Sequence, residues 1–205
     1  SEKAVADISR TIRICAEAGI GAVNFTTGPG GEAPAWPAEH WWAAPTRPDP
    51  AAWDLLVRGI ETLAAAAERC GVDLAVEPCT GNLVSELATA QELLARCQHP
   101  RLKLTFDPSH FVLAGQDLRL AVGRLGPRFR LVHLKDALGR PGVLGRDFLF
   151  PLLGEGATDW PALFGALRGA GYAGALSVEF ESFRFMADVW DGDPAPAARI
   201  SKLAA

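Results

Sequence analysis

The chain has 205 residues, of which 49% are hydrophobic and 21% are charged, and its formal net charge is −4. This length and composition are typical of one globular domain over residues 1–205 and exclude a disordered chain. The sequence shows no apolar run of the roughly 18 residues that a membrane helix needs, no signal peptide and no basic block, so we expect a cytoplasmic protein without membrane or nucleic-acid partners.

The first predicted element is a helix over residues 1–18, because apolar residues recur there near a period of 3.6 and Gly19 is a suitable stop. A strand over residues 22–25 follows. Residues 28–48 form a long loop rich in Gly, Pro and Trp, which includes Trp36. Loops of this length are usually functional or disordered, and the bulky aromatic residues favour a lid or a contact between subunits of a homo-oligomer.

The chain then alternates between predicted helices and strands. A helix is expected to begin at Pro50 and to end at Gly71. Thr89 and Glu92 have the spacing of a capping box, which predicts the start of a helix that runs through Cys97.

Two further helix starts are indicated by aspartate caps. Asp117 precedes a short predicted helix over residues 118–125, and Asp159 precedes one over about 160–170. The stretch between them, residues 137–158, is expected to be irregular.

Four short apolar runs each end in a residue that can bind a metal or move a proton. These runs are Leu74-Ala75-Val76 before Glu77, Leu102–Phe106 before Asp107, Phe129–Val132 before His133, and Leu176–Val178 before Glu179. Short apolar runs are typical of parallel strands buried on both faces, and their alternation with helices predicts an α/β fold with right-handed crossovers. The polar ends favour a barrel, because barrel active sites gather at the carboxyl ends of the strands.

The ligand types at these strand ends favour a particular metal chemistry. Three carboxylates and one imidazole suit Mn or Mg better than structural zinc, which prefers thiolates. A metal there can hold a sugar carbonyl and stabilise the enediolate that forms when the neighbouring carbon loses its proton. One glutamate can remove that proton and the other can return it. The residues leave epimerisation, aldose–ketose isomerisation and elimination open.

The four cysteines show no CxxC spacing, and we expect them to be reduced thiols rather than disulfides. They are Cys15, Cys70, Cys79 and Cys97.

Five motifs, in their order and spacing over about residues 1–185, resemble the xylose-isomerase-like TIM-barrel superfamily. They are Val76-Glu77-Pro78, Phe106-Asp107-Pro108-Ser109-His110, Val132-His133-Leu134-Lys135-Asp136, Gly154-Glu155-Gly156-Ala157-Thr158-Asp159-Trp160 and Ser177-Val178-Glu179. The superfamily includes sugar isomerases and epimerases, inosose dehydratases and the endonuclease IV class. The resemblance implies a (β/α)8 barrel of which this chain supplies the last six units, lacking the first one or two, with residues 22–25 as the third strand.

The resemblance also implies the roles of the strand-end residues. Glu77, Asp107, His133 and Glu179 would bind one divalent metal, with Mn favoured over Mg, Co and Zn. Glu77 and Glu179, from strands four apart, would be the pair that moves protons. His110 would contact the substrate.

Three more side chains are candidates for substrate contact. Lys135 is one, and the alternative is that Lys135 and Asp136 form a solvated ion pair. Arg184, after the last strand, can meet an anionic group, and Trp36 can stack on a sugar ring or pack between subunits. Glu181 lies two residues after Glu179 and points the same way in a regular strand, either backing the site or meeting water.

We therefore expect a metal-dependent isomerase or epimerase of a sugar or keto-sugar. The alternative is a lyase or dehydratase on the same site, acting on an inosose or a 3-keto-glycoside. An endonuclease is disfavoured, because the zinc-binding Asp-x-His pair of that class is replaced here by Phe148 and Phe150, and the net charge is acidic. A catalytically inactive binding module remains a further alternative.

Overall fold

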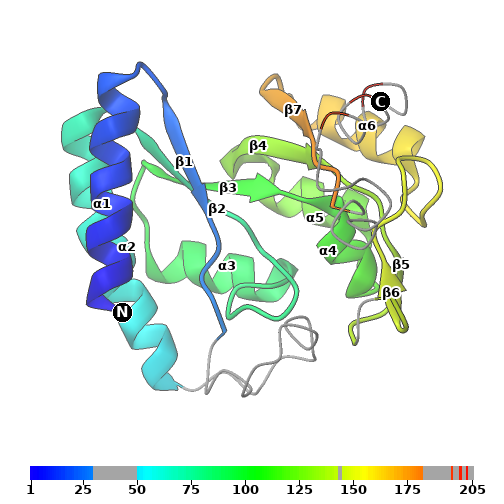
Figure 1. Cartoon of the computed structure of the whole chain (residues 1–205), viewed down its shortest axis with the longest axis horizontal. Helices are drawn as coiled ribbons and strands as arrows, with labels where there is room; N and C mark the ends of the chain where they lie inside the picture. Colours follow the sequence, from blue (N-terminus) through cyan, green and yellow to red (C-terminus); the bar gives the residue numbers. More distant parts are fainter. Residues whose placement is uncertain (30–49, 143–144, 182–194, 196–198, 200–201, 203–205) are drawn as a thin grey trace.

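The computed structural model describes residues 1–29, 50–142 and 145–181, together with residues 195, 199 and 202 (Figure 1). In chain order its elements are α1 (Glu2–Glu17), β1 (Ala22–Phe25), α2 (Pro50–Cys70), β2 (Asp73–Val76), α3 (Leu87–Arg96), β3 (Leu102–Phe106), α4 (Pro108–Leu113), α5 (Leu118–Leu125), the 3-10 helix η2 (Gly126–Arg128), β4 (Phe129–Leu134), β5 (Leu138–Gly139), β6 (Phe148–Leu149), α6 (Trp160–Gly169) and β7 (Ala175–Val178).

Within the described residues, five strands form one parallel sheet in the order β1-β2-β3-β4-β7. Phe25 pairs with Val76 between β1 and β2, and His133 pairs with Ser177 between β4 and β7. Because the strands run in parallel, their carboxyl ends lie along one edge of the sheet. The predicted parallel α/β class is confirmed.

The order of the strands corrects one expectation. The strands that precede Glu77 and Glu179 were expected to be four apart, but β2 and β7 are three places apart, because β7 pairs directly with β4. The described sheet accordingly has five strands where six units were expected. The stretch over residues 137–158, expected to be irregular, contributes instead the antiparallel pair β5–β6, which lies outside the main sheet.

The helices follow local signals in the sequence. Ser1 caps α1 by accepting a hydrogen bond from the backbone N–H of Ala4, and Gly19 follows the helix with φ 70°. In Figure 1, α1 and α2 lie side by side. Helix α1 contacts β1, α2 contacts β2, and α6 packs against α5. The apolar faces of these helices pack on the sheet, where Ile12 of α1 and Ile60 of α2 are almost completely buried.

The start of α3 differs from the prediction. The helix begins at Leu87 with Glu86 as its N-cap, so Thr89 is the third helical residue and not the cap. The hydroxyl of Thr89 accepts a 3.1 Å hydrogen bond from the backbone N–H of Glu86. Glu92, expected to complete a capping box, instead forms a 2.7 Å ion pair with Arg96 one turn later.

Both aspartate caps are confirmed. Asp117 accepts a 2.8 Å hydrogen bond from the backbone N–H of Arg119, and Asp159 accepts a 3.0 Å bond from that of Ala162. A second, small apolar cluster lies beyond the main core, near the carboxyl end of the sheet. Its buried members are Cys79, Leu113, Ala137, Phe148 and Phe150.

None of the helices in the described part of the chain combines the length and the apolar character that crossing a membrane requires. The four cysteines are all free thiols, as predicted.

Candidate metal centre

Glu77, Asp107, His133 and Glu179 come together at the carboxyl ends of β2, β3, β4 and β7. Each offers one ligand atom, and these four atoms all lie within 4.8 Å of one another. The Nδ1 atom of His133 lies 2.9 Å from Glu179 Oε2 and 3.4 Å from Glu77 Oε1. The structure thus brings the four predicted residues to one place, and their role as metal ligands stays a prediction.

Hydrogen bonds to backbone groups position the three carboxylates. The N–H of Glu77 donates to the carbonyl of Phe25 at 3.0 Å, and the N–H of Glu179 donates to that of Leu134 at 3.1 Å. Asp107 ends β3 and also caps α4, because its Oδ1 accepts a 2.9 Å hydrogen bond from the N–H of Ser109. The other oxygen of Asp107 is left to face the cluster.

Asn24 belongs to the site and was not predicted. Its Nδ2 donates a 2.9 Å hydrogen bond to Glu77 Oε2, from β1 to the end of the neighbouring β2. The signal in the sequence was the single polar residue in the run Ala22-Val23-Asn24-Phe25. Which partner that amide meets depends on the pairing of two strands that are separated by a long segment.

Lys135 is buried among carboxylates, with 3% of its side chain exposed. Its Nζ atom lies 2.8 Å from Asp107 Oδ2, 3.2 Å from Glu179 Oε2 and 3.1 Å from Glu181 Oε2. The same atom lies 4.7 Å from the centre of the Phe150 ring. The reading of Lys135 and Asp136 as a solvated pair is therefore wrong, and Glu181 does face the site.

Asp136 turns its side chain to the Gly154-Glu155-Gly156 turn rather than to solvent. Its Oδ2 accepts hydrogen bonds from the N–H groups of Gly154 and Gly156, both at 3.0 Å, and from the indole N–H of Trp160 at 3.1 Å. A Cβ at residue 156 would stand 2.1 Å from Asp136 Oδ1, so the turn requires glycine there. The carboxylate ties this turn to the end of β4.

His110 lies on α4 and is 1% exposed. Its Nε2 is 3.5 Å from Asp107 Oδ2 and 3.9 Å from Glu77 Oε1. Burial lowers the pKa of His110 to about 4, and the charge of Lys135 acts in the same direction, so its imidazole is neutral at neutral pH. A substrate contact by His110 stays a prediction.

Trp36 and Arg184, the two other predicted substrate contacts, lie outside the described residues, as does most of the loop over residues 28–48.

The donor set fits a divalent cation. Asp107 Oδ2 and His133 Nδ1 are buried and lie beside charged neighbours, yet neither has a hydrogen bond of good geometry within the described residues. Burial acts to lower the pKa of His133, but the neighbouring carboxylates of Glu179 and Glu77 outweigh burial and raise this pKa to about 10. The cluster therefore attracts positive charge strongly, and hard oxygen ligands with one imidazole suit Mn, Mg or Zn.

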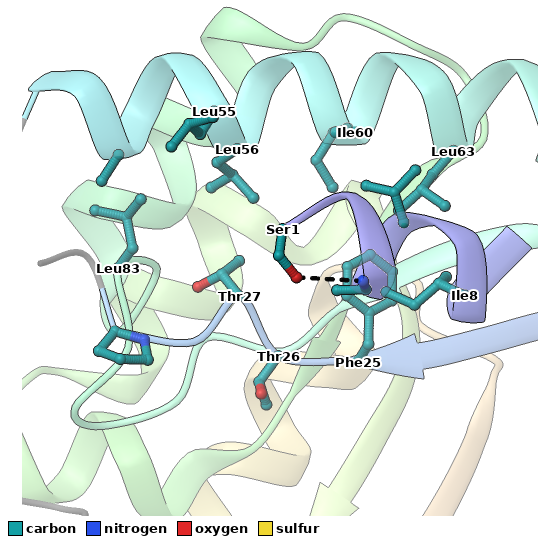
Figure 2. A pocket seen from close by; sticks show the side chains of 15 residues that line it. Ser1, Ile8, Phe25, Thr26, Thr27, Leu55, Leu56, Ile60, Leu63 and Leu83 are labelled. Carbon is teal, nitrogen blue, oxygen red and sulfur yellow. Dashed lines mark hydrogen bonds between the residues drawn. The ribbon is translucent and has the colours of Figure 1, made fainter. Parts of the chain in front are cut away.

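The described chain also has a cavity of about 230 Å³ between α1, α2 and the segment after β1 (Figure 2). Its lining is mainly aliphatic, with Leu56, Ile60 and Leu63 from α2 facing Phe25 and Thr27. Among the described residues that line it there is no carboxylate or imidazole, whereas the strand ends of the described chain carry several such groups.

Comparison with known proteins points to one family. The profile of the xylose isomerase-like TIM barrel family matches residues 1–202. An inosose dehydratase of Geobacillus thermodenitrificans is 29% identical over 140 residues, which cover 63% of this chain and 47% of the relative. The chain thus spans about half the length of the curated relatives it matches.

Solved structures agree with the barrel fold. The crystal structure of the IolI protein with a bound zinc atom has a TM-score of 0.71 at 20% identity and covers 98% of this chain and 66% of that one. The apo structure of the 3-keto-D-glucoside 4-epimerase YcjR from E. coli has a TM-score of 0.67 at 20% identity, with 97% and 68% covered. At these identities the similarity establishes the fold alone.

Proposed function

Because the chain belongs to the xylose isomerase-like TIM barrel family, we propose that it forms the active site of a divalent-metal-dependent isomerase or epimerase of a sugar or keto-sugar. The observation that carries this proposal is the set of four ligand atoms within 4.8 Å of one another at the strand ends. An isolated carboxylate at a strand end is ordinary, but three carboxylates and one imidazole that converge from four strands form a ligand set suited to a divalent cation.

Glu77, Asp107, His133 and Glu179 would hold the metal, and Mn is our first choice for a site rich in carboxylates. When bound, the metal supplies Lewis-acid chemistry, which stabilises negative charge on a carbonyl oxygen of the substrate. Because the metal stabilises this charge, the proton on the neighbouring carbon becomes easier to remove.

The two glutamates differ in a way that suggests separate duties. The side chain of Glu179 is 35% exposed, whereas that of Glu77 is 8% exposed and is held by Asn24. We assign removal of the proton to Glu179, because an exposed carboxylate can exchange that proton with solvent. Glu77 would return a proton from its fixed position just after β2. Return to the same carbon gives epimerisation, and return to the adjacent carbon gives isomerisation.

The neutral imidazole of His110 fits a supporting duty. Its Nε2 lies beside Asp107 and Glu77, which contribute to the cluster. A neutral imidazole can donate a hydrogen bond to a substrate oxygen without adding a positive charge next to the metal. We assign orientation of the substrate to His110.

A dehydratase is the second candidate, because the Geobacillus relative at 29% identity is an inosose dehydratase. The first step is the same removal of a proton by Glu179. The reactions diverge at the next step, in which a hydroxyl group on the adjacent carbon takes up a proton from one of the two glutamates and leaves as water, so that no proton returns to carbon.

An experiment on the purified protein distinguishes these outcomes. A panel of ketoses, inososes and 3-keto-glycosides is incubated with Mn²⁺ in deuterated water. An isomerase or epimerase incorporates deuterium beside the carbonyl without loss of water. A dehydratase releases one water from the substrate, and mass spectrometry detects that loss. Failure of the protein to bind any divalent metal would contradict the proposal for both reactions.

A further inference from the structure

Lys135 places a positive charge inside the proposed metal centre. Two of its three partners, Asp107 at 2.8 Å and Glu179 at 3.2 Å, belong to the four-residue cluster, and the third, Glu181 at 3.1 Å, does not. A lysine ammonium has three N–H donors. Two of these donors form hydrogen bonds with Glu179 and Glu181, and Asp107 lies within ion-pair distance, so three carboxylates share the charge of this ammonium.

The charges around this ammonium explain its presence. Glu77, Asp107, Glu179 and Glu181 would place four negative charges in a small and mostly buried volume. Buried carboxylates without a cation repel one another and lose hydration, at a cost of several kcal/mol per ion. Lys135 offsets part of that charge when the metal is absent.

The same position makes Lys135 a competitor of the metal. The ammonium already contacts Asp107 Oδ2 and Glu179 Oε2, and a bound divalent cation would draw on the same two carboxylates. Two cations that share these ligands also repel each other, and that repulsion is only weakly screened in a buried site.

Glu181 and Phe150 hold Lys135 on the side of the cluster. The Glu181 carboxylate offers the ammonium a partner outside the four ligand residues, and the Phe150 face lies 4.7 Å from Nζ. Without Glu181, the ammonium would depend on Asp107 and Glu179 alone and would hold them more tightly.

We propose that Lys135 is a built-in counter-cation that competes with the metal for Asp107 and Glu179, and that Glu181 sets the strength of this competition. This inference rests on the proposed function, because it concerns the same metal. It assigns to Lys135 a positioning role, in place of the substrate contact expected from the sequence.

The test measures Mn²⁺ affinity of the whole chain by competition with a chromogenic chelator. Lys135→Met keeps the length of the side chain and removes its charge, so Mn²⁺ binding is expected to tighten about tenfold, since a like charge a few ångströms away is lost. Glu181→Gln is expected to weaken binding about threefold, although Glu181 is not a ligand. The two partners of one ion pair thus shift the affinity in opposite directions.

A double-mutant cycle shows whether Glu181 acts through Lys135. In the Lys135→Met background, Glu181→Gln is expected to change the Mn²⁺ affinity by less than in the wild-type chain. The matched control is Lys103→Met, which removes the same charge from β3 roughly 13 Å before Asp107 and is expected to leave the affinity unchanged. Circular dichroism of each variant verifies that the fold is kept.

Melting temperatures provide a readout that is independent of the chelator. Lys135→Met is expected to lower the melting temperature of the metal-free chain and to enlarge the rise that Mn²⁺ produces. If Lys135→Met does not fold without metal, the Mn²⁺ affinity of Glu181→Gln still tests the proposal. Unchanged or tighter Mn²⁺ binding by Glu181→Gln overturns it. Equal or weaker Mn²⁺ binding by a folded Lys135→Met overturns it as well. A wild-type chain that binds no metal instead refutes the proposed function itself.

Discussion

Asn24 holds one oxygen of Glu77 through a 2.9 Å hydrogen bond, although the two residues are 53 positions apart in the chain. The bond leaves Glu77 Oε1 directed at His133, 3.4 Å away. Asn24 therefore decides which oxygen of Glu77 faces the proposed metal.

We predict that Asn24→Ala lowers kcat about tenfold with little change in KM, because a misoriented catalytic carboxylate mainly slows the chemical step. Asn24→Asp has the same shape but removes the N–H donor and sets a second carboxylate against Glu77, so its kcat is expected to fall further. Steady-state kinetics on the substrate found in the panel measure both. Wild-type kinetics in Asn24→Asp would show that the hydrogen bond has no part in catalysis.

Glu179→Gln is expected to leave the fold intact, because Glu179 is partly exposed and lies beyond the end of β7. The amide cannot accept the substrate proton, and loss of a general base costs about 10²–10⁴ in rate. Solvent deuterium incorporation beside the carbonyl is the measurement. Exchange at the wild-type rate in the variant would assign the base to another residue.

Metal binding is expected to release about one proton per Mn²⁺ at pH 8. The pKa of His133 is about 10 in the metal-free chain, so its imidazole is protonated at this pH, whereas a ligating imidazole must be neutral. Because this folded-state pKa lies above the ordinary value of about 6.5, protonation of His133 stabilises the metal-free chain below pH 6.5, and that contribution is lost as the pH rises through 10.

Calorimetric titrations of Mn²⁺ in two buffers with different ionisation enthalpies measure the proton release. His133→Asn serves as the control, because it removes the titrating group while keeping a polar side chain. Equal apparent enthalpies in both buffers for the wild-type chain would contradict the prediction.

Asp136→Asn is expected to destabilise the chain by about 2–3 kcal/mol. In the wild-type chain, the N–H groups of Gly154 and Gly156 donate to a carboxylate oxygen, and in the variant an NH₂ group, which is itself a donor, would face them. Urea unfolding measures the loss. Asp159→Asn is the matched control, since asparagine caps a helix as well as aspartate does and should cost much less. Similar losses in the two variants would contradict a special role for Asp136.

The Asp136 carboxylate also makes a prediction about acid stability. Burial acts to raise its pKa, but hydrogen bonds from Thr158, Trp160 and Ala137 outweigh burial and hold the pKa below the usual value. Its contribution to stability is therefore present above about pH 3.9 and is lost as the pH falls through the lower folded-state pKa. Asp136→Asn is expected to lack this part of the acid transition.

The strand-end positions of Glu77, Asp107 and Glu179 were readable from the chain, because an apolar run followed by a polar residue marks the end of a buried strand. The caps Asp117 and Asp159 were readable for the same kind of reason, since each acts on residues two or three positions away. Thr89 was wrongly predicted to be the cap of α3, because the residues on both sides of it are compatible with a helix start. The hydrogen bond from Glu86 to the Thr89 hydroxyl shows that the helix begins one turn earlier, after Glu86.

Interactions between distant segments were not readable in this way. The pairing of β7 with β4 brings Glu179 beside Lys135, and the pairing of β1 with β2 brings Asn24 to Glu77. The burial of Lys135, which was open from the sequence, follows from that strand order and from the packing of Phe150.

Local backbone geometry dictates where a strand stops and which way its last side chain points, so the chemical character of the centre was available from short stretches of sequence. The partners of each charged group depend on the order in which strands pair and on how far neighbouring side chains exclude water. Those properties arise only when segments far apart in the chain pack together, and they are what turn four separate strand ends into one charged site.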